Sequence, residues 1–332
     1  MARPHIEPFV DRDVAFKPMT LPGFKPGMHY KTLSIDSDTG ASSLTVQYDA
    51  GFKQPPGFCY SEMEFLLMEG SLTIGGKKWQ KGLYGFIPAG VSLPAMSTDE
   101  GALLLVFYNF GPPSFVESDK DHQNADRTDF KLVDSYQGMD WQNSTLFPAT
   151  APGCLLKILH IDKRTFGMTF LYCMTPGFWQ DNISYHDCAE EAYHIWGTSW
   201  MMQFGELPTG GYFWRPAYIN HGCFASELGI LAIGRTDGDL HNYFHHDPFS
   251  TPEENHERAA SRLARMKPAL YNWILTSEHN HLPHDFEYPN DTYKTEGWDT
   301  GIHMHDDGTV HHHTASGAHS HLGGNKKKKK KN

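Results

Sequence analysis

The sequence repeats itself at an interval of about 126 residues, and this repeat restricts the folds that the chain can adopt. The offset is 126 in the first matched segments, 127 in the middle and 128 in the last. Single insertions in short turns produce such a steady increase, whereas chance matches would drift in both directions. The 332-residue chain therefore holds two copies of one unit. The matched segments are residues 31–36 and 157–162, Gly51–Phe52 and Gly177–Phe178, Gly70 and Gly197, Pro88–Ala89 and Pro216–Ala217, and Gly101 and Gly229.

Each copy consists of short segments that are apolar or alternate between apolar and polar residues, with Gly, Pro or Asp between them. Such segments predict β-strands, and many short strands without long helices between them indicate a sandwich or a barrel. In the first copy the expected strands are Ser43–Asp49, Glu64–Glu69, Ser71–Ile74 and Ala102–Tyr108. In the second copy they are Leu155–Ile161, Met168–Met174, Ala192–Trp196, Trp200–Phe204 and Ile230–Ile233.

The chain outside the two copies contains one expected helical segment and a polar tail. Ser250 or Thr251 can cap the helix, Pro252 suits its first turn, Glu253 complements its positive end, and Pro268 breaks it. The tail has no helix or strand period, so we expect much of it to be disordered. The expected divisions are an N-terminal extension (1–27), a first barrel (28–112), a linker (113–151), a second barrel (152–248), a helical segment (249–278) and a His- and Lys-rich tail (279–332).

Two stretches of the second copy carry the residue types that hold a divalent metal. Residues 184–197 (SYHDCAEEAYHIWG) contain His186 and Glu190, and residues 215–222 (RPAYINHG) contain His221. Two imidazoles and one carboxylate are a common ligand set for iron, zinc and related ions. We therefore predict that these three residues bind one divalent metal ion per chain.

The first copy provides an internal comparison, because it lacks all three candidate ligands. At the positions aligned with His186, Glu190 and His221 it has Cys59, Met63 and Leu93. The turns around these positions are kept in both copies, so the loss concerns the ligands alone. We expect the first barrel to be without a metal. A carboxylate pair in that barrel, Glu62 and Glu64, is a rival cation site, although charged strand ends in solvent are the simpler interpretation.

Strand alternation determines which residues share the metal-binding face. Glu190, Ala192 and His194 lie on one face of the expected strand, and Glu191 and Tyr193 lie on the other. The spacing to the following glycine favours Glu190 as the ligand, and Glu191 would take its place in the opposite register. We name His194, as a proton relay or a further ligand, and Tyr193 as candidate catalytic residues.

The order of the candidate ligands resembles the paired motifs of the cupin superfamily. The motif residues in this sequence are His186, Glu190, Gly197, Pro216 and His221. Two such units in one chain look like a bicupin, and the resemblance covers residues 28–112 and 152–247. It implies two jelly-roll barrels, a metal or ligand pocket at a barrel mouth, and association into a homodimer. The family pattern has a further histidine where this chain has Ser184, which leaves three protein ligands.

Three ligands on one side of an ion leave coordination positions open for a substrate, water or O2. This arrangement is typical of non-haem Fe(II) oxygenases and of zinc hydrolases. We favour Fe(II), with Mn or Zn as alternatives, and a dioxygenase that acts on a small aromatic or enolic molecule with chelating oxygens. The alternatives are a zinc- or manganese-dependent lyase, isomerase or decarboxylase, and a non-catalytic bicupin that binds or senses a small molecule.

Aromatic residues are dense around the two motifs and suggest a pocket for an apolar or aromatic substrate. A nearby arginine offers a partner for an anionic group on that substrate. The expected pocket residues are Trp179, Trp196, Trp214, Arg215 and Tyr218.

Composition narrows the partners and the compartment. The net charge of −11 argues against a nucleic-acid surface. The longest apolar run, residues 102–108, is far short of the roughly 20 residues that span a membrane. The first ten residues contain no apolar run typical of a signal peptide, and the five cysteines are scattered. We expect a cytoplasmic protein with a small-molecule substrate and without nucleic-acid or membrane partners.

Overall fold

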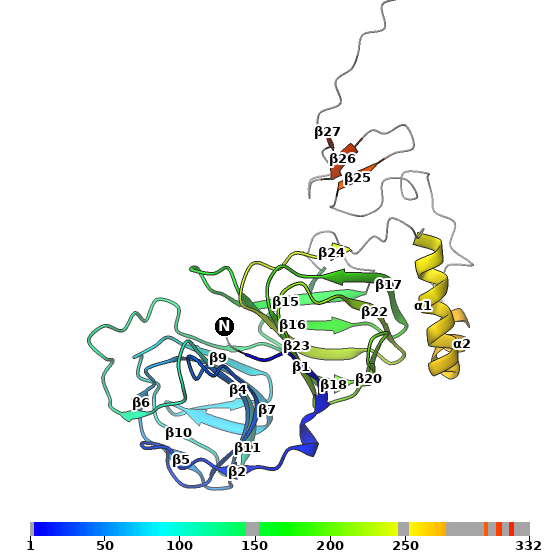
Figure 1. Cartoon of the computed structure of the whole chain (residues 1–332). Coiled ribbons are helices and arrows are strands. Elements are labelled where there is room, and N and C mark those ends of the chain that lie inside the picture. The colour runs from blue at the N-terminus through cyan, green and yellow to red at the C-terminus, as the bar shows by residue number, and fades with distance from the viewer. Residues whose placement is uncertain are drawn as a thin grey trace, which may run out of the picture.

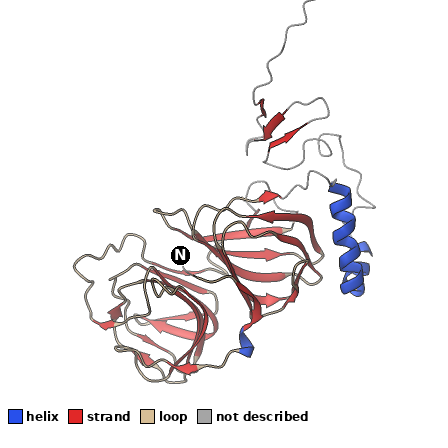
Figure 2. Ribbon diagram, in the orientation of Figure 1, coloured by secondary structure: helices blue, strands red, loops and turns tan. Residues whose placement is uncertain are grey.

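The computed structural model describes residues 3–143, 153–244 and 252–276, together with three short strands of the tail. These residues form two β-barrels and two helices beside the second barrel (Figures 1 and 2). The all-β class and the tandem barrels predicted from the sequence are therefore confirmed. No helix in the described part of the chain is long and apolar enough to cross a membrane.

The first barrel is built on one large sheet with the strand order β13-β9-β7-β11-β4-β3-β2. Shorter strands complete it: β10 pairs with β5 and β7, β8 pairs with β7, and β12 pairs with β6. The two segments expected at 64–69 and 71–74 form one continuous strand. The strands are β2 (Lys17–Pro18), β3 (Met28–Ile35), β4 (Ser42–Tyr48), β5 (Lys53–Gln54), β6 (Gly57–Phe58), β7 (Glu62–Ile74), β8 (Lys77–Gln80), β9 (Leu83–Ile87), β10 (Met96–Ser97), β11 (Ala102–Asn109), β12 (Val116–Glu117) and β13 (Lys131–Asp134).

The second barrel has a seven-stranded sheet, β1-β21-β18-β23-β16-β15-β14, and a five-stranded sheet, β20-β19-β22-β17-β24. A short 3-10 helix, η1 (Asp11–Asp13), follows β1. The strands are β1 (Ile6–Val10), β14 (Gln142–Asn143), β15 (Cys154–Ile161), β16 (Met168–Met174), β17 (Phe178–Tyr185), β18 (Glu190–Gly197), β19 (Ser199–Met201), β20 (Gly205–Leu207), β21 (Gly211–Arg215), β22 (His221–Ser226), β23 (Ile230–Thr236) and β24 (Tyr243–Phe244).

The sequence repeat appears in the structure as two sheets of the same topology. The order β9-β7-β11-β4-β3 in the first barrel corresponds to β21-β18-β23-β16-β15 in the second. Matched glycines explain part of the repeat. Gly70 and Gly197 have φ of 75° and 89°. A Cβ at Gly70 would lie 2.2 Å from the carbonyl oxygen of Gly101, and one at Gly197 would lie 2.3 Å from that of Gly229. Both positions therefore need glycine.

Each barrel borrows an edge strand from the chain segment that precedes the other barrel. Strand β1, from the N-terminal extension, pairs with β21 of the second barrel. Strand β13, from the segment expected as a linker, pairs with β9 of the first barrel. The strands β9 and β21 are equivalent in the repeat, so the exchange is reciprocal. It covers one free edge of each large sheet with main-chain hydrogen bonds.

The two large sheets pack against each other through a mixed apolar core, as the ribbon diagrams indicate (Figures 1 and 2). In β7, Leu66 and Met68 face the second barrel, while Phe65 and Leu67 belong to the core of the first. The second barrel contributes Leu159, Leu171, Tyr193, Tyr212, Trp214 and Ile233. The large sheets are therefore buried on both faces, and the barrels form one packed unit.

Two helices cover the smaller sheet of the second barrel. Helix α1 (Pro252–Met266) begins at the predicted proline, and α2 (Pro268–Thr276) begins at the proline expected to break it. Ala259, Leu263 and Ile274 of the helices pack with Trp179 and Trp200 of the sheet. The expected helical segment is confirmed, and it closes the side of the barrel that faces away from the first barrel (Figure 1).

The tail prediction concerns residues that lie mostly outside the described part of the chain. The exceptions are β25 (Ile302–Met304), β26 (Val310–His313) and β27 (His319–His321), which form a three-stranded antiparallel sheet. The sequence pattern did not lead us to expect strands there.

Candidate metal centre

Three side chains of the second barrel converge at the ends of neighbouring strands. His186 follows β17, Glu190 begins β18 and His221 begins β22. The Nε2 atoms of the two histidines are 3.1 Å apart. A carboxylate oxygen of Glu190 is 3.7 Å from each of these nitrogen atoms. Among the described residues this is the one group of three His, Cys, Asp or Glu side chains close enough to share a metal ion.

Backbone carbonyl groups orient both imidazole rings. The Nδ1 atom of His186 lies 2.8 Å from the carbonyl oxygen of His241, and Nδ1 of His221 lies 2.8 Å from that of Ile219. A carbonyl oxygen only accepts, so Nδ1 carries the proton in each ring. Nε2 of each ring then carries a lone pair that can bind a cation. Metal-ligating histidines are usually held in this way by a hydrogen bond from their second nitrogen.

The candidate ligands are largely buried, and burial favours the neutral form of His221. The side chains of His186, Glu190 and His221 are 8%, 15% and 6% exposed. Burial, the neighbouring His186 and the charge of Arg215 lower the pKa of His221 to about 3, although the hydrogen bond to Ile219 opposes this. His221 is therefore neutral over the physiological pH range, which is the form that binds a metal.

The donor set and its spacing fit a first-row divalent ion. Two donors that each lie about 2.1 Å from an ion are about 3.0 Å apart at right angles and about 3.4 Å apart in a tetrahedron. The observed separations of 3.1, 3.7 and 3.7 Å need adjustments of only a few tenths of an ångström. All three donors can therefore contact one ion together.

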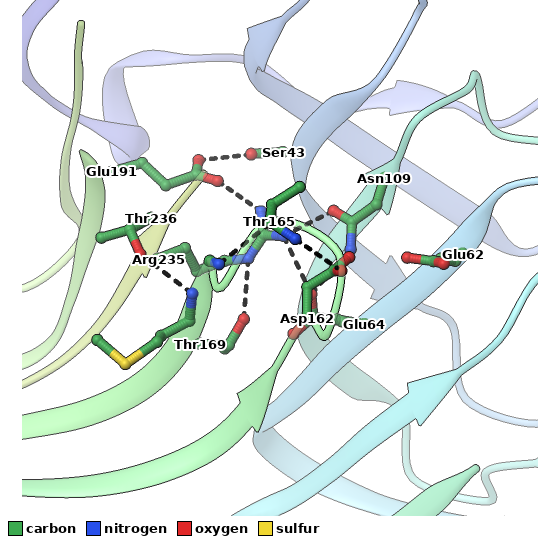
Figure 3. A network of polar contacts seen from close by, with 12 residues as sticks. Ser43, Glu62, Glu64, Asn109, Asp162, Thr165, Thr169, Glu191, Arg235 and Thr236 are labelled. Atoms are coloured by element: carbon green, nitrogen blue, oxygen red, sulfur yellow. Dashed lines mark hydrogen bonds and ion pairs between the residues drawn. The ribbon is translucent and has the colours of Figure 1, made fainter. Parts of the chain in front are cut away.

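Glu191, the alternative ligand, points to the other face of β18 and lies between the barrels. Arg235 donates to one of its carboxylate oxygens at 2.6 Å, and Ser43 and Tyr212 donate to the other, each at 2.6 Å. Figure 3 shows Glu191 and Ser43 beside Arg235, with Glu64 of the first barrel on the opposite side. The structure therefore places Glu190 in the cluster and Glu191 in a network that joins the two barrels.

The two candidate catalytic residues do not meet the cluster. Tyr193 shares the outer face with Glu191, and its hydroxyl group donates to Asp11 at 3.0 Å. His194 shares the inner face with Glu190, but four residues of strand separate them by about 13 Å. Its Nδ1 is 3.0 Å from the carbonyl oxygen of Leu207, and burial lowers its pKa to about 4. His194 is thus a neutral core histidine.

The three expected tryptophans lie away from the cluster, whereas Arg215 and Tyr218 lie beside it. Trp179 packs against the helices, Trp214 lines a cavity of about 310 Å³ between the barrels, and Trp196 is 55% exposed. Arg215 is paired directly with Glu190 across β18 and β21. The backbone N–H of Tyr218 donates to the carbonyl oxygen of His186 at 2.7 Å, but its side chain is 68% exposed.

The equivalent position in the first barrel is filled with apolar side chains. Cys59, Met63 and Leu93 line a remnant cavity of about 20 Å³. This volume is close to that of a single water molecule. Burial raises the pKa of the Cys59 thiol to about 12, so the thiol keeps its proton at neutral pH.

The carboxylates Glu62 and Glu64 of the first barrel are held by arginines of the second barrel. Arg164 contacts Glu62 at 2.7 Å, and Arg235 contacts Glu64 at 3.0 Å. Asn109 also donates to Glu64, at 2.9 Å. The rival cation site therefore consists of two inter-barrel ion pairs, of which Figure 3 shows the one between Arg235 and Glu64.

Sequence reasoning missed Arg235 and the carbonyl groups that orient the two histidines. Backbone carbonyls leave no trace in residue types. A signal for the network did exist: Glu64 and Glu191 match at the offset of 127, and Tyr84 and Tyr212 match at 128. Each tyrosine donates to its own glutamate at 2.6 Å.

The two tandem barrels, with a candidate metal-ligand group at one end of the second, have the fold that the resemblance to the cupin superfamily predicts, and known structures share this fold. A "putative dioxygenase" from Nostoc punctiforme has a TM-score of 0.67 and 22% identity, over 74% of this chain and 92% of that one. The protein YlbA from E. coli has a TM-score of 0.50 and 14% identity, over 71% and 91%. At such identities the likeness concerns the fold.

The family of this chain follows from its match to a protein-family model. Residues 25–243 match the family described as a domain of unknown function, DUF4437. The match covers more than half of the chain and includes both barrels, so the chain belongs to this family. No curated protein matches the sequence.

Proposed function

We propose that this protein is a metal-dependent cupin enzyme that acts on a small organic molecule with chelating oxygens, as a non-haem iron dioxygenase. The observation that carries the proposal is the convergence of two oriented imidazoles and one carboxylate, close enough together to share one ion. Two histidines and one carboxylate are the ligands of non-haem Fe(II) oxygenases. Fe(II) would supply redox chemistry and open coordination positions for two reactants.

The chain's own residues would hold and shield this centre. His186 and His221 bind through Nε2 because their Nδ1 protons are engaged by carbonyl groups. Glu190 neutralises one of the two charges of a divalent ion. Below it, Ala192 and Phe213 belong to an apolar cluster inside the barrel, which keeps water away from that side. A substrate would therefore approach from the strand ends.

Metal content tests the ligand assignment. The full chain and a chain that ends at residue 300 are compared in parallel, because the shorter chain lacks seven tail histidines. After exhaustive dialysis we expect about one ion per chain in the wild type and in His29→Ala, which replaces a surface histidine that pairs with Asp49. His221→Ala should lose this ion. Equal metal content in His221→Ala and wild type would overturn the assignment.

The type of metal is tested with nitric oxide, a stable substitute for O2. The Fe(II)-loaded protein should give the electron paramagnetic resonance signal of a high-spin iron nitrosyl, because open coordination positions remain. His221→Ala should not give it. Metal retention without this signal would favour the zinc- or manganese-dependent alternatives, in which the ion does not react with oxygen.

A further inference from the structure

Arg215 places a buried guanidinium group beside the candidate metal centre. It is the last residue of β21 and lies directly opposite Glu190 of β18. Directly opposed residues of neighbouring strands project to the same face, so the two side chains share the barrel interior. Arg215 is 4% exposed, and its Nε and Nη1 atoms have no hydrogen-bond partner. A buried guanidinium group without partners is rare because the loss of its hydration is costly.

Aromatic rings, rather than hydrogen-bond acceptors, surround the guanidinium group of Arg215. The centres of the Phe213 and Phe204 rings lie 5.2 and 5.4 Å from its Cζ atom. No ion pair within 4.0 Å joins Arg215 to any carboxylate of the described residues. The other buried arginines differ: Arg235 meets Glu191 at 2.6 Å, and Arg3 meets it at 3.5 Å. The fold therefore fixes the position of Arg215 and leaves its Nε and Nη1 donors without a partner.

The strand pairing places the guanidinium group near the candidate ligands. Because Arg215 and Glu190 are directly opposed on β21 and β18, an anion that contacted Arg215 would lie near an ion held by Glu190. Burial lowers the pKa of Arg215, and the negative charges of Glu190 and, less strongly, of Glu7 oppose this effect.

The charge balance of the occupied site calls for such an anion. A divalent ion, one carboxylate and one guanidinium group, with both histidines neutral, leave an excess of about two positive charges in a buried site. A ligand that carries a carboxylate group would remove much of this excess. Arginine suits that role because its planar fork binds both oxygens of a carboxylate.

We propose that Arg215 is the recognition residue for a carboxylate group of the substrate, whose neighbouring oxygen reaches the metal. The substrate class is then a small 2-hydroxy- or 2-oxo-carboxylate, aromatic or enolic. This inference rests on the proposed function for the role of the metal, but the preference of Arg215 for anions is independent of it.

Matched probes test this assignment. Salicylate carries a carboxylate beside a hydroxyl group, and salicylamide replaces the carboxylate with a neutral amide of similar shape. Binding of each to the Mn(II)-loaded full chain is measured by calorimetry. The wild type should prefer salicylate by roughly tenfold or more, the worth of hydrogen bonds between charged groups. Arg215→Met should lose the preference, and Arg215→Lys should keep part of it. Arg164→Met, which changes an exposed arginine, should keep all of it.

The outcomes separate the two proposals. Absence of a preference for salicylate in the wild type, or an unchanged preference in Arg215→Met, would overturn the role of Arg215. Should Arg215→Met not fold, a salicylate preference in Arg215→Lys as large as in the wild type would count against the bidentate role, and a smaller one would support it. Failure of the wild type to bind Mn(II) without a probe would count against the metal centre alone. The two probes are then compared with the metal-free protein, where Arg215 acts by itself.

Discussion

The network between the barrels predicts that Arg235→Met lowers the free energy of unfolding severely. Arg235 is a single guanidinium group shared by two buried carboxylates, at 2.6 Å from Glu191 and 3.0 Å from Glu64. Their side chains are 5% and 2% exposed. Asn109 accepts a further hydrogen bond from Arg235 at 2.6 Å (Figure 3). The ring of Phe107 lies 4.1 Å from the Cζ atom of Arg235.

The expected cost follows from leaving a buried charge without its partner. Burial would raise the pKa of Glu64, but Arg235 and hydrogen bonds from Thr169, Tyr84 and Asn109 outweigh it, so the pKa is lowered. Both glutamates are therefore charged at pH 7. Removing one member of a buried ion pair typically costs about 3–5 kcal/mol. Arg3 remains near Glu191 but has no ion pair with Glu64 among the described residues, so Glu64 bears most of the loss.

Urea unfolding at pH 7, followed by tryptophan fluorescence, measures this cost. The matched control is Arg164→Met: Arg164 also joins the barrels, but its side chain is 60% exposed, so we expect a loss of less than about 1 kcal/mol. A third variant combines Arg235→Met with Glu64→Gln. It should recover much of the stability, because Glu64 no longer carries a buried charge and Glu191 keeps its ion pair with Arg3. Equal losses in Arg235→Met and Arg164→Met, or no recovery in the combined variant, would refute the reasoning.

Two further predictions concern residues that sequence reasoning assigned to the active site. The pKa of His194 is lowered to about 4 in the folded protein, against about 6.5 when unfolded, so its stabilising effect is present above pH 6.5 and is lost as the pH falls toward 4. The loss is about 3 kcal/mol, and His194→Asn should lack it when urea unfolding of the metal-free protein is compared at pH 7 and pH 4.5; parallel pH profiles would contradict this. Tyr218 has a φ of 68° and is 68% exposed, so Tyr218→Asn should raise the free energy of unfolding by up to about 1 kcal/mol and leave Mn(II) affinity unchanged. A clear drop in that affinity would show that Tyr218 supports the metal centre.

The repeat, the barrels and the convergence of the three candidate ligands could be predicted because each depends on local spacing. Matched glycines mark turns that both copies need, and the ligands stand at fixed distances from those glycines. The contrast between His186 and Cys59 depends only on the alignment of the two copies. Strand parity also separates Glu190 from Glu191 once the register is known.

The surroundings of these residues could not be predicted, because both faces of the large sheets are buried. Alternation assigns Tyr193 and Trp214 to one face, but an apolar face looks the same whether it lines a barrel or contacts another barrel. The pairing of β1 with β21 joins segments about 200 residues apart, and no local pattern specifies it. Arg235 likewise depends on how the barrels dock, since its partner Glu64 belongs to the other copy.

Because each barrel takes one edge strand, β1 or β13, from the segment that precedes the other barrel, neither half of the molecule contains all the strands of its own sheet. A fragment that ends before β13 would expose the edge of β9, and its strand β1 would lack its partner β21. The complementary fragment would expose the edge of β21, and its strand β13 would lack its partner β9. An uncovered edge invites pairing with another chain. The smallest fragment of this protein that leaves neither sheet edge uncovered therefore includes both barrels, even though only one of them contains the candidate ligands.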